Sequence, residues 1–306
     1  MTQPDSSDAT TTPARRPAPV TIRTLQRMAQ AGEAFACLTC YDATTARLLE
    51  RAGVPVLLVG DTAAEVILGY SRTIDMPLDV LIALTAGVKR GAPNTLVMGD
   101  MPFMSYQADD AEALRNAGRF LTQGLADVVK LEVDRTFAPL VEKMTRAGIP
   151  VCGHVGSKPQ RAALSGGYSA AGRTKHEAQE IVADAIALEQ AGAVLLLVEA
   201  VPDEVTDAIL KATRVPLIGI GAGPACHGQV LVLQDALGLS EHAPRFVDPV
   251  AQLADQVVAA GAEWVRRVRA RELGGRRYTM KDGASPTPQA PAHSQRPGRP
   301  ATKPMG

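Results

Sequence analysis

The stretch Thr95-Leu96-Val97-Met98-Gly99-Asp100 decides the fold, because it is a short apolar run that ends in a charged residue. Five further runs end in a charged or titratable residue or in a glycine cluster, at Asp61, Lys130-Leu131-Glu132, His154, Glu199 and Gly221-Ala222-Gly223. Short β-rich runs that alternate with longer helical stretches are typical of βα units around a buried parallel sheet. The carboxyl ends of such strands meet at one mouth, where active sites are built. The pattern therefore predicts the fold class and also the place of a site.

The count of βα units favours a closed (β/α)8 TIM barrel in the α/β class. Strand candidates begin at Ala34, Val54, Asn94, Asp127, Ile149, Ala193 and Val215, with a weaker eighth at Arg245-Phe246-Val247. Nothing indicates the reversal of strand order that an open sheet would show.

Helix ends are marked by glycines between the predicted strands. The stretch from Leu78 to Lys89 ends at Gly91, and the stretch from Asp109 to Thr122 ends at Gly124. A further dipeptide, Ala-Gly before a strand, predicts a C′ glycine at residues 53, 148 and 192. A helix is also predicted from Ala251 to Val268, whose lone Trp264 we expect to pack or to contact another subunit.

Composition excludes several classes of partner. The chain has 306 residues, a net charge of zero, 46% hydrophobic residues and only 4% aromatic residues. An aliphatic core suits a barrel, and the balanced charge disfavours nucleic-acid binding. No apolar stretch approaches the roughly 20 residues of a membrane span, and residues 1–19 lack the apolar core of a secretory signal. Four cysteines are too few for a disulfide framework, which favours a cytoplasmic location.

The domain organisation is simple. Residues 1–19 lack hydrophobic periodicity, and residues 273–306 are rich in proline among polar residues. We expect both tails to be disordered, because they cannot bury enough apolar surface to offset the cost of ordering. Between them, residues 20–272 are expected to form one catalytic barrel domain.

Three carboxylates end successive predicted strands, namely Asp61, Asp100 and Glu132. Converging like charges raise one another's pKa, and a bound divalent cation removes that cost. All-oxygen ligands select a hard ion, Mg²⁺ first and Mn²⁺ or Co²⁺ as substitutes. The alternative is that each carboxylate caps the following helix, since Asp is a good N-cap. Because three occur together, we favour the metal site.

Three more residues are candidates for chemistry. Lys130 lies inside an apolar strand, two residues before Glu132, and would offer a positive charge to an anion or a developing enolate. Glu199 ends the most apolar strand, where burial disfavours its charged form and suits a general acid/base. His154 either supports the site or is an ordinary hydrogen-bonded rim histidine.

Glycines and cysteines give weaker signals. Gly219-Ile220-Gly221-Ala222-Gly223 lacks the dinucleotide-binding spacing, so a Rossmann site is rejected, although Gly221 and Gly223 could support an anion by their backbone N–H groups. The C-x-x-C pair Cys37 and Cys40 lies in a strand, where period two separates the side chains onto opposite faces. A zinc or redox site is therefore not expected there.

A series of collinear motifs runs along the chain from about Thr21 to Arg271. They include Leu38-Thr39-Cys40-Tyr41-Asp42, Val59-Gly60-Asp61, Gly99-Asp100-Met101-Pro102-Phe103-Met104-Ser105-Tyr106, Val129-Lys130-Leu131-Glu132, Pro150-Val151-Cys152-Gly153-His154-Val155-Gly156, Pro159-Gln160, Leu197-Val198-Glu199-Ala200-Val201-Pro202 and Gly228-Gln229-Val230-Leu231-Val232. With these motifs the chain resembles the ketopantoate hydroxymethyltransferase (3-methyl-2-oxobutanoate hydroxymethyltransferase) family of the phosphoenolpyruvate mutase/isocitrate lyase superfamily.

The resemblance implies a barrel enzyme that is commonly a homo-oligomer, a decamer, and that acts in pantothenate synthesis. It implies transfer of a hydroxymethyl group from 5,10-methylenetetrahydrofolate to 3-methyl-2-oxobutanoate through a Mg²⁺-stabilised enolate. By resemblance, Asp61, Asp100 and Glu132 surround the Mg²⁺, and Glu199 is the proton acceptor. The keto acid is held by Asp61, Thr62, Asp100 and Lys130.

The chain departs from the family after Asp61, where Thr62-Ala63-Ala64-Glu65 stands in place of the usual Ser-Leu-Gly. Two alternatives therefore stay open. The chain could be a divergent paralogue that performs aldol-type or C–C lyase chemistry on another 2-oxo acid. It could also be a non-catalytic barrel that binds a metabolite, although such a barrel has no need of mutually repelling carboxylates.

Overall fold

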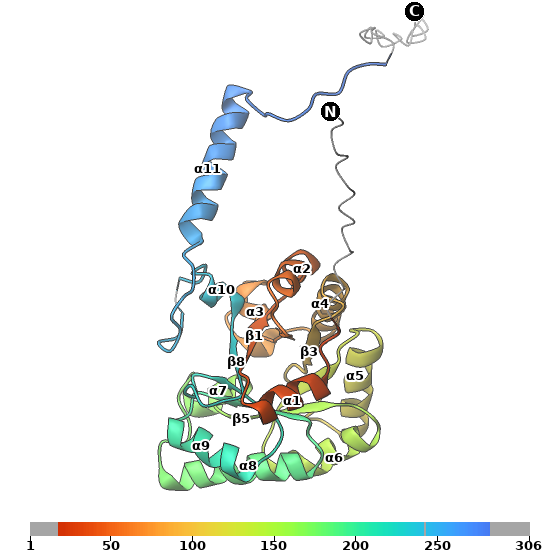
Figure 1. Ribbon diagram of the computed structural model, residues 1–306, viewed down its shortest axis with the longest axis vertical. Helices are drawn as coiled ribbons and strands as arrows, with labels where there is room; N and C mark the ends of the chain where they lie inside the picture. Colours follow the sequence, from red (N-terminus) through yellow and green to blue (C-terminus); the bar gives the residue numbers. More distant parts are fainter. Residues whose placement is uncertain (1–17, 242, 282–306) are drawn as a thin grey trace, which may run out of the picture. The chain divides into compact units, whose positions relative to one another are not determined.

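Eight parallel strands form a closed barrel in the order of the sequence, as the computed structural model of residues 18–241 and 243–281 shows (Figure 1). The strands are β1 (Phe35–Thr39), β2 (Val56–Val59), β3 (Leu96–Asp100), β4 (Val128–Glu132), β5 (Val151–Gly156), β6 (Leu195–Glu199), β7 (Leu217–Ile220) and β8 (Gly228–Leu231). β1 pairs with both β2 and β8, which closes the sheet. The predicted (β/α)8 TIM barrel is thus confirmed.

The eighth strand is not where the apolar run predicted it. Arg245-Phe246-Val247 lies in a turn region, and the barrel is closed by Gly228–Leu231 instead. That strand was missed because it is short and contains an exposed polar Gln229 and a glycine. Phe246 has another use, since its ring packs against Gly221, where an added Cβ would lie 2.7 Å from Cδ1 of the ring.

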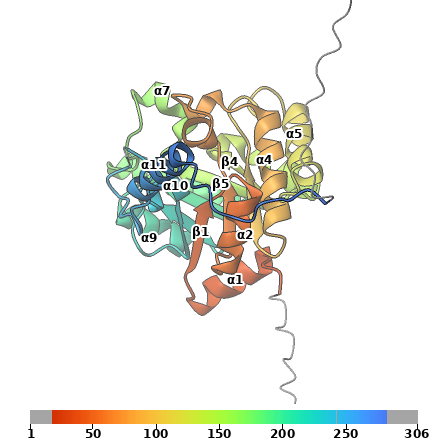
Figure 2. The same cartoon turned by 90° about the horizontal axis from the view of Figure 1, so that it is seen from above.

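Helices lie around the strands, as the view from above shows for α2, α4, α5 and α9 (Figure 2). The helices are α1 (Ile22–Ala31), α2 (Ala43–Arg51), α3 (Ala63–Val66), α4 (Leu78–Gly91), α5 (Asp110–Thr122), α6 (Ala138–Arg146), α7 (Ala162–Ser165), α8 (Lys175–Gln190), α9 (Asp203–Ala212), α10 (Leu233–Ala236) and α11 (Ala254–Ala270), with 3-10 turns η1 (Thr73–Asp75), η2 (Arg135–Phe137) and η3 (Pro159–Arg161).

The predicted glycine stops are confirmed at three αβ connections. Gly53, Gly148 and Gly192 follow α2, α6 and α8 with φ values of +83°, +86° and +95°. At each of them the glycine N–H and the next N–H donate to carbonyls of the last helical turn. This C-terminal motif needs a residue in the left-handed region, which glycine adopts without strain.

Two apolar layers fill the molecule. One lies inside the barrel and consists of inward-facing residues such as Val56, Met98, Cys152 and Leu195, joined at its end by Leu25 of α1. The other lies between the strands and the surrounding helices. Because α1 contributes to the interior layer, the amino end of the barrel is closed by a packed helix.

The two cysteines of the C-x-x-C pair lie in different layers, as the sequence predicted. Cys37 belongs to the interior layer and Cys40 to the outer layer. All four cysteines of the chain are free and buried. The C-x-x-C pair is therefore split between two faces, as period two predicted.

The contacts within the chain divide it into two compact units, with the division after Gln256. The barrel belongs to the first unit, and the second begins within α11, before the predicted end of the barrel domain at residue 272. The predicted disorder of residues 1–17 and 282–306 lies outside the described residues. The predicted limits 1–19, 20–272 and 273–306 and the role of Trp264 stay predictions. In the part of the chain that the structure describes, no helix is long and apolar enough to cross a membrane.

Two glycines of α4 give a direct test of packing between α2 and α4. A Cβ at Gly91 would lie 2.3 Å from the backbone oxygen of Ala43, whereas a Cβ at Gly87 would meet nothing within 4 Å. We expect Gly91→Ala to lower the free energy of unfolding by about 1–3 kcal/mol, because the backbone must move. Gly87→Ala should raise it by about 0.5–1 kcal/mol, because alanine loses less conformational entropy in a helix. Urea denaturation of both variants checks this, and equal effects at the two positions would contradict the packing.

Candidate active site

Period two along the strands brings the polar residues to the inside of the barrel mouth. Inward-facing Met98 is followed two residues later by Asp100, and Cys152 is followed by His154. Asp100 is paired in register with Lys130, and Glu132 with His154. The same alternation that builds the apolar interior therefore turns polar side chains inward at the ends of β3, β4, β5 and β6.

Asp61 and Asp100 are joined by a buried hydrogen bond. The backbone N–H of Asp61 donates to Oδ2 of Asp100 at 2.9 Å, and both carboxylates are buried. Neither they nor Glu132 cap a helix. Thr62 directly precedes α3 and no side chain caps that helix, α5 is capped by Asp109, and η2 is capped by Asp134. The capping alternative is therefore wrong for these three carboxylates.

Lys130 supplies the positive charge of this cluster. Its Nζ lies 2.8 Å from Oδ1 of Asp100, and the side chain is buried. Burial alone would lower the pKa of the ammonium, but Asp100, Glu132 and Asp61 raise it above its ordinary value. Lys130 is thus a buried side chain that keeps its positive charge. It is not a solvated surface lysine.

Three carboxyl groups surround the single ammonium group of Lys130, and their mutual repulsion raises pKa values in the cluster. Burial raises the pKa of Asp61 well above its ordinary value, and Asp100 and Glu132 add repulsion. Burial also raises the pKa of Glu132, to about 7. Because these carboxyl groups disfavour one another's ionised form, a bound cation would stabilise them as carboxylates.

Gln160 is a site residue that the sequence analysis did not single out. Its side-chain Nε2 donates to Oδ2 of Asp61 at 2.9 Å, and its backbone N–H donates to Oε2 of Glu132 at 2.9 Å. The hydroxyl of Tyr106 lies 2.9 Å from Oε1 of Gln160 and accepts from the backbone N–H of Glu132. Gln160 therefore holds two carboxylates, one by its side chain and one by its backbone. The only signal in the sequence was its place in the motif Pro159-Gln160.

His154 connects the lysine to Glu199. Its Nδ1 lies 3.5 Å from Nζ of Lys130, and its Nε2 lies 3.4 Å from Oε2 of Glu199. An ammonium group can only donate, so Nδ1 must accept, and the hydrogen of the neutral ring then sits on Nε2. Burial and the charge of Lys130 keep the pKa of His154 well below its ordinary value, so the ring is neutral. The histidine therefore lies between Lys130 and Glu199 and is more than a rim residue, although its Nε2 has no hydrogen-bond partner among the described residues.

Glu199 has the properties that the apolar strand predicted. Its side chain, at the carboxyl end of β6, has 21% of its surface exposed. Burial raises its pKa to about 8, and the nearby Glu132 adds to the rise. A carboxyl group with a pKa near neutrality can both accept and return a proton under physiological conditions.

These groups share a small cavity of about 50 Å³. The predicted site residues that line it are Asp61, Thr62, Asp100, Lys130, Glu132, His154 and Glu199. The remaining wall is largely aliphatic, with Leu58, Leu197, Ile220, Val230 and Val232. The cavity therefore combines a charged side with a branched-chain apolar side.

The donor set fits a hard divalent cation. Asp61, Asp100 and Glu132 offer only oxygen and carry more negative charge than Lys130 balances. Within residues 18–241 and 243–281, no three His, Cys, Asp or Glu side chains are already arranged as metal ligands. Mg²⁺ commonly takes only one or two carboxylates and fills its remaining positions with substrate oxygens and water.

The glycines after β7 do not line this cavity. A Cβ at Gly223 would lie 2.3 Å from Oδ1 of Asp203, and Gly221 packs against Phe246. An adjacent carboxylate disfavours an anion at Gly223. The two glycines therefore serve close packing, and their predicted supporting role in the site finds no contact in the structure.

The chain matches a family model described as ketopantoate hydroxymethyltransferase over residues 19–275. A 3-methyl-2-oxobutanoate hydroxymethyltransferase of Moorella thermoacetica is 43% identical over 263 residues, which are 86% of this chain and 98% of that protein. The enzyme of the same name from Thermobifida fusca is 45% identical over 81% of this chain and 89% of its own length.

Solved structures share the fold at lower sequence identity. Phosphonopyruvate hydrolase in complex with oxalate and Mg²⁺ has a TM-score of 0.57 and 15% identity, covering 82% of this chain and 87% of its own. A 2,3-dimethylmalate lyase of the phosphoenolpyruvate mutase/isocitrate lyase superfamily has a TM-score of 0.53 and 18% identity, covering 87% and 93%. These similarities agree with the barrel.

The repulsion among the carboxylates predicts a stabilising substitution. Because the pKa of Asp61 is raised in the folded state, its ionisation costs stability as the pH rises towards that folded value. Asp61→Asn removes this cost and keeps an oxygen for Gln160. We expect a gain of about 1 kcal/mol or more in unfolding free energy without divalent cations, and this gain should grow as the pH rises above about 4, the ordinary pKa of an aspartate.

Urea denaturation with a chelator measures this gain. Asp109→Asn is a matched control, because Asp109 caps α5 through the N–H of Glu112 and asparagine caps equally well. A loss of stability in Asp61→Asn, or a gain independent of pH, would contradict the repulsion.

Proposed function

The chain belongs to the ketopantoate hydroxymethyltransferase family, and from this premise we propose that it transfers a hydroxymethyl group to 3-methyl-2-oxobutanoate. The donor would be 5,10-methylenetetrahydrofolate, and the product 2-dehydropantoate, an intermediate of pantothenate synthesis. The methylene carbon of the donor and one water together supply the CH₂OH group. The predicted homo-oligomer and cytoplasmic location stay predictions.

One observation supports this proposal most directly, namely that one cavity has a charged side and an aliphatic side. A 2-oxo acid with a branched end presents two oxygen groups and two methyl groups. Lys130 would bind the anionic oxygens, and Thr62 would offer its hydroxyl beside them. The aliphatic side, with Leu197 and Val230, would hold the methyl groups.

Mg²⁺, when bound by Asp61, Asp100 and Glu132, would withdraw electron density from the keto acid and make the C–H at C3 more acidic. Gln160 keeps two of these carboxylates in place through its two donors. Lys130 stays charged beside Asp100, so it can stabilise the negative charge that develops on the keto oxygen. The side chains therefore have distinct tasks, although they share one cavity.

Glu199 is the group that we propose as the proton acceptor. It lies at the same cavity and stands apart from the three proposed ligands, so its oxygens are available for the C3 proton. Nε2 of His154 lies 3.4 Å from Oε2 of Glu199, and a hydrogen bond formed between them during the reaction would fix the orientation of the carboxylate. After the proton leaves, C3 forms a bond to the methylene carbon of the donor, and the oxygen of one water forms a second bond to that carbon. Both C–N bonds of the methylene carbon break, and the two nitrogens take up the protons released from C3 and from the water, which leaves tetrahydrofolate.

The first test follows C3 of 3-methyl-2-oxobutanoate in deuterated water. We expect exchange of the C3 hydrogen to require a divalent cation and to proceed without folate, because acidification precedes the transfer. NMR measures the exchange, and mass spectrometry then identifies the product after methylenetetrahydrofolate is added. A panel of other 2-oxo acids serves as the control.

Equal exchange with Mg²⁺ and with a chelator would contradict the proposed role of the cation. Exchange and product formation on a different 2-oxo acid alone would favour the divergent paralogue. Binding of the keto acid without exchange under all conditions would favour the non-catalytic barrel.

The second test concerns Glu199. As a base it must be ionised, and its pKa is raised to about 8, so kcat should rise with pH through that value. Glu199→Gln keeps the shape of the side chain but cannot accept the proton. We expect kcat to fall by roughly 10²–10⁴ and the pH dependence to disappear.

Pre-steady-state binding of the keto acid to Glu199→Gln should stay near the wild-type affinity, because the amide preserves the packing. A variant with near-normal kcat and the same rise with pH would exclude Glu199 as the base. A base would then have to be sought among Lys130, His154 or a bound water.

A further inference from the structure

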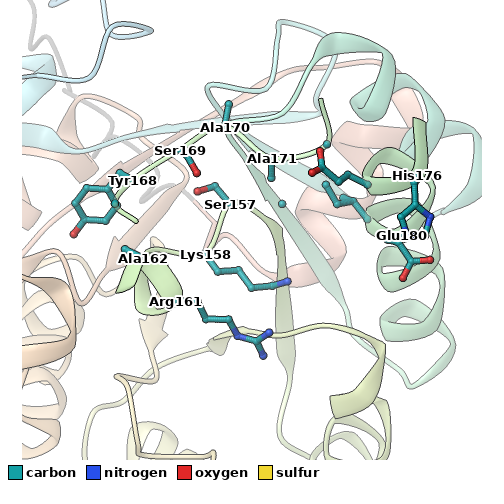
Figure 3. A pocket seen from close by; sticks show the side chains of 15 residues that line it. Ser157, Lys158, Arg161, Ala162, Tyr168, Ser169, Ala170, Ala171, His176 and Glu180 are labelled. Atoms are coloured by element: carbon teal, nitrogen blue, oxygen red, sulfur yellow. The ribbon is translucent and has the colours of Figure 1, made fainter. Parts of the chain in front are cut away.

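A second and much larger cavity, of about 540 Å³, lies beside the end of β5 (Figure 3). Its walls come from the segment after β5, from the loop between α7 and α8, and from the first turns of α8. A cavity of this size is typical of sites that bind ligands of drug-like dimensions. None of the residues proposed above for the reaction lines it.

The two cavities share one short segment of chain. Pro159 lines the small cavity, whereas Lys158 and Arg161 line the large one. The large cavity also reaches towards the barrel mouth at Tyr168, whose hydroxyl donates to Oε1 of Glu65 in α3. α3 begins directly after Thr62, a residue of the small cavity. A ligand in the large cavity can therefore lie next to the proposed reaction centre.

Lys158 brings to the large cavity a positive charge that has no ion-pair partner among the described residues. The acidic residues of this wall are engaged, since Glu177 accepts from the N–H groups of Arg173 and Thr174, and Glu180 pairs with Arg135.

The other cation of this wall is partly engaged, because Arg161 pairs with Asp134 at 2.9 Å through Nη1. Among the described residues, no carboxylate lies within ion-pair distance of the Lys158 ammonium. Burial and the nearby Arg161 lower the pKa of Lys158, which an anionic ligand would reverse. The cavity is thus suited to an anion.

The two sides of the large cavity differ in their side chains. Figure 3 shows Tyr168 on one side and the ends of Lys158 and Arg161 on the other. The tyrosine side lies towards α3 and the barrel mouth, and the cationic side faces α8. A ligand with a reactive end and a separate anionic end would therefore place its anionic end at Lys158.

We propose that this cavity binds the folate donor, with the carboxylates of its glutamate tail at Lys158 and its pterin end towards Tyr168. This inference rests on the proposed function, because that reaction needs a large donor and the small cavity of about 50 Å³ cannot hold one. The donor suits the cavity in size and in its anionic tail, and its pterin ring would lie beside Tyr168.

The test measures equilibrium binding of two probes to the full chain, by calorimetry or fluorescence. Tetrahydrofolate carries the glutamate tail, and tetrahydropteroate lacks it. We expect Lys158→Gln to raise the Kd of tetrahydrofolate by about tenfold or more and to leave the Kd of tetrahydropteroate unchanged. Lys211→Gln is the matched control, because Lys211 is exposed on α9, outside the cavity, and should bind both probes like the wild type.

Each outcome decides the inference without reference to turnover. Equal weakening of both probes in Lys158→Gln, or unchanged binding of tetrahydrofolate, would overturn the assignment of the tail. Failure of the wild type to bind tetrahydrofolate would overturn the inference altogether. Failure of the proposed function is recognised separately, as missing exchange and missing product with the wild-type protein.

Discussion

The ion pair between Lys130 and Asp100 holds the mouth of this barrel together. The two residues are neighbours in register on β3 and β4, and Nζ of Lys130 lies 2.8 Å from Oδ1 of Asp100 inside the protein. Breaking such a buried pair leaves an unpaired charge in a medium that solvates it poorly. Because Asp100 also accepts from Asp61, and Lys130 also faces His154, the pair fixes the arrangement of the other groups.

The cluster around this pair is a source of strain as well as of function. One ammonium faces three acidic side chains, and burial raises the pKa of Asp61 and of Glu132 above their ordinary values. A fold selected only for stability would place apolar residues here, as it does one layer deeper at Met98 and Leu195. Along the same inward-facing rows, the residues change from aliphatic to ionisable. This change marks the boundary between the apolar layer that stabilises the barrel and the candidate active site.

The sequence predicted those features that follow from a regular period. Asp100, Lys130, Glu132 and Glu199 lie in strands, where alternation fixes the direction of each side chain, so their convergence could be inferred. The capping alternative for the carboxylates could not be excluded in the same way, because it depends on where each helix begins. The structure shows that Asp42, Asp109 and Asp134 cap helices or turns, whereas Asp61 and Asp100 do not.

Residues in loops were beyond the reach of such an argument. Gln160 and Lys158 belong to the segment after β5, where no period relates sequence position to direction, so their contacts could not be foreseen. β8 was misplaced for a related reason, since Gly228 and Gln229 give no apolar signal and the strand is recognised only by its partners β1 and β7.

The helix at the other end of the barrel has a kinetic consequence. Leu25 of α1 belongs to the interior layer and packs at the amino end, so within the described part of the chain reactants would reach the proposed reaction cavity from the carboxyl end. Reactants and products that pass through the same opening must arrive and depart in turn. If the two reactants occupy the two cavities as proposed, the smaller one would lie deeper and enter first, and its product would leave only after the larger partner has withdrawn. A helix far from the chemistry would thereby impose an order on the steps of each catalytic cycle.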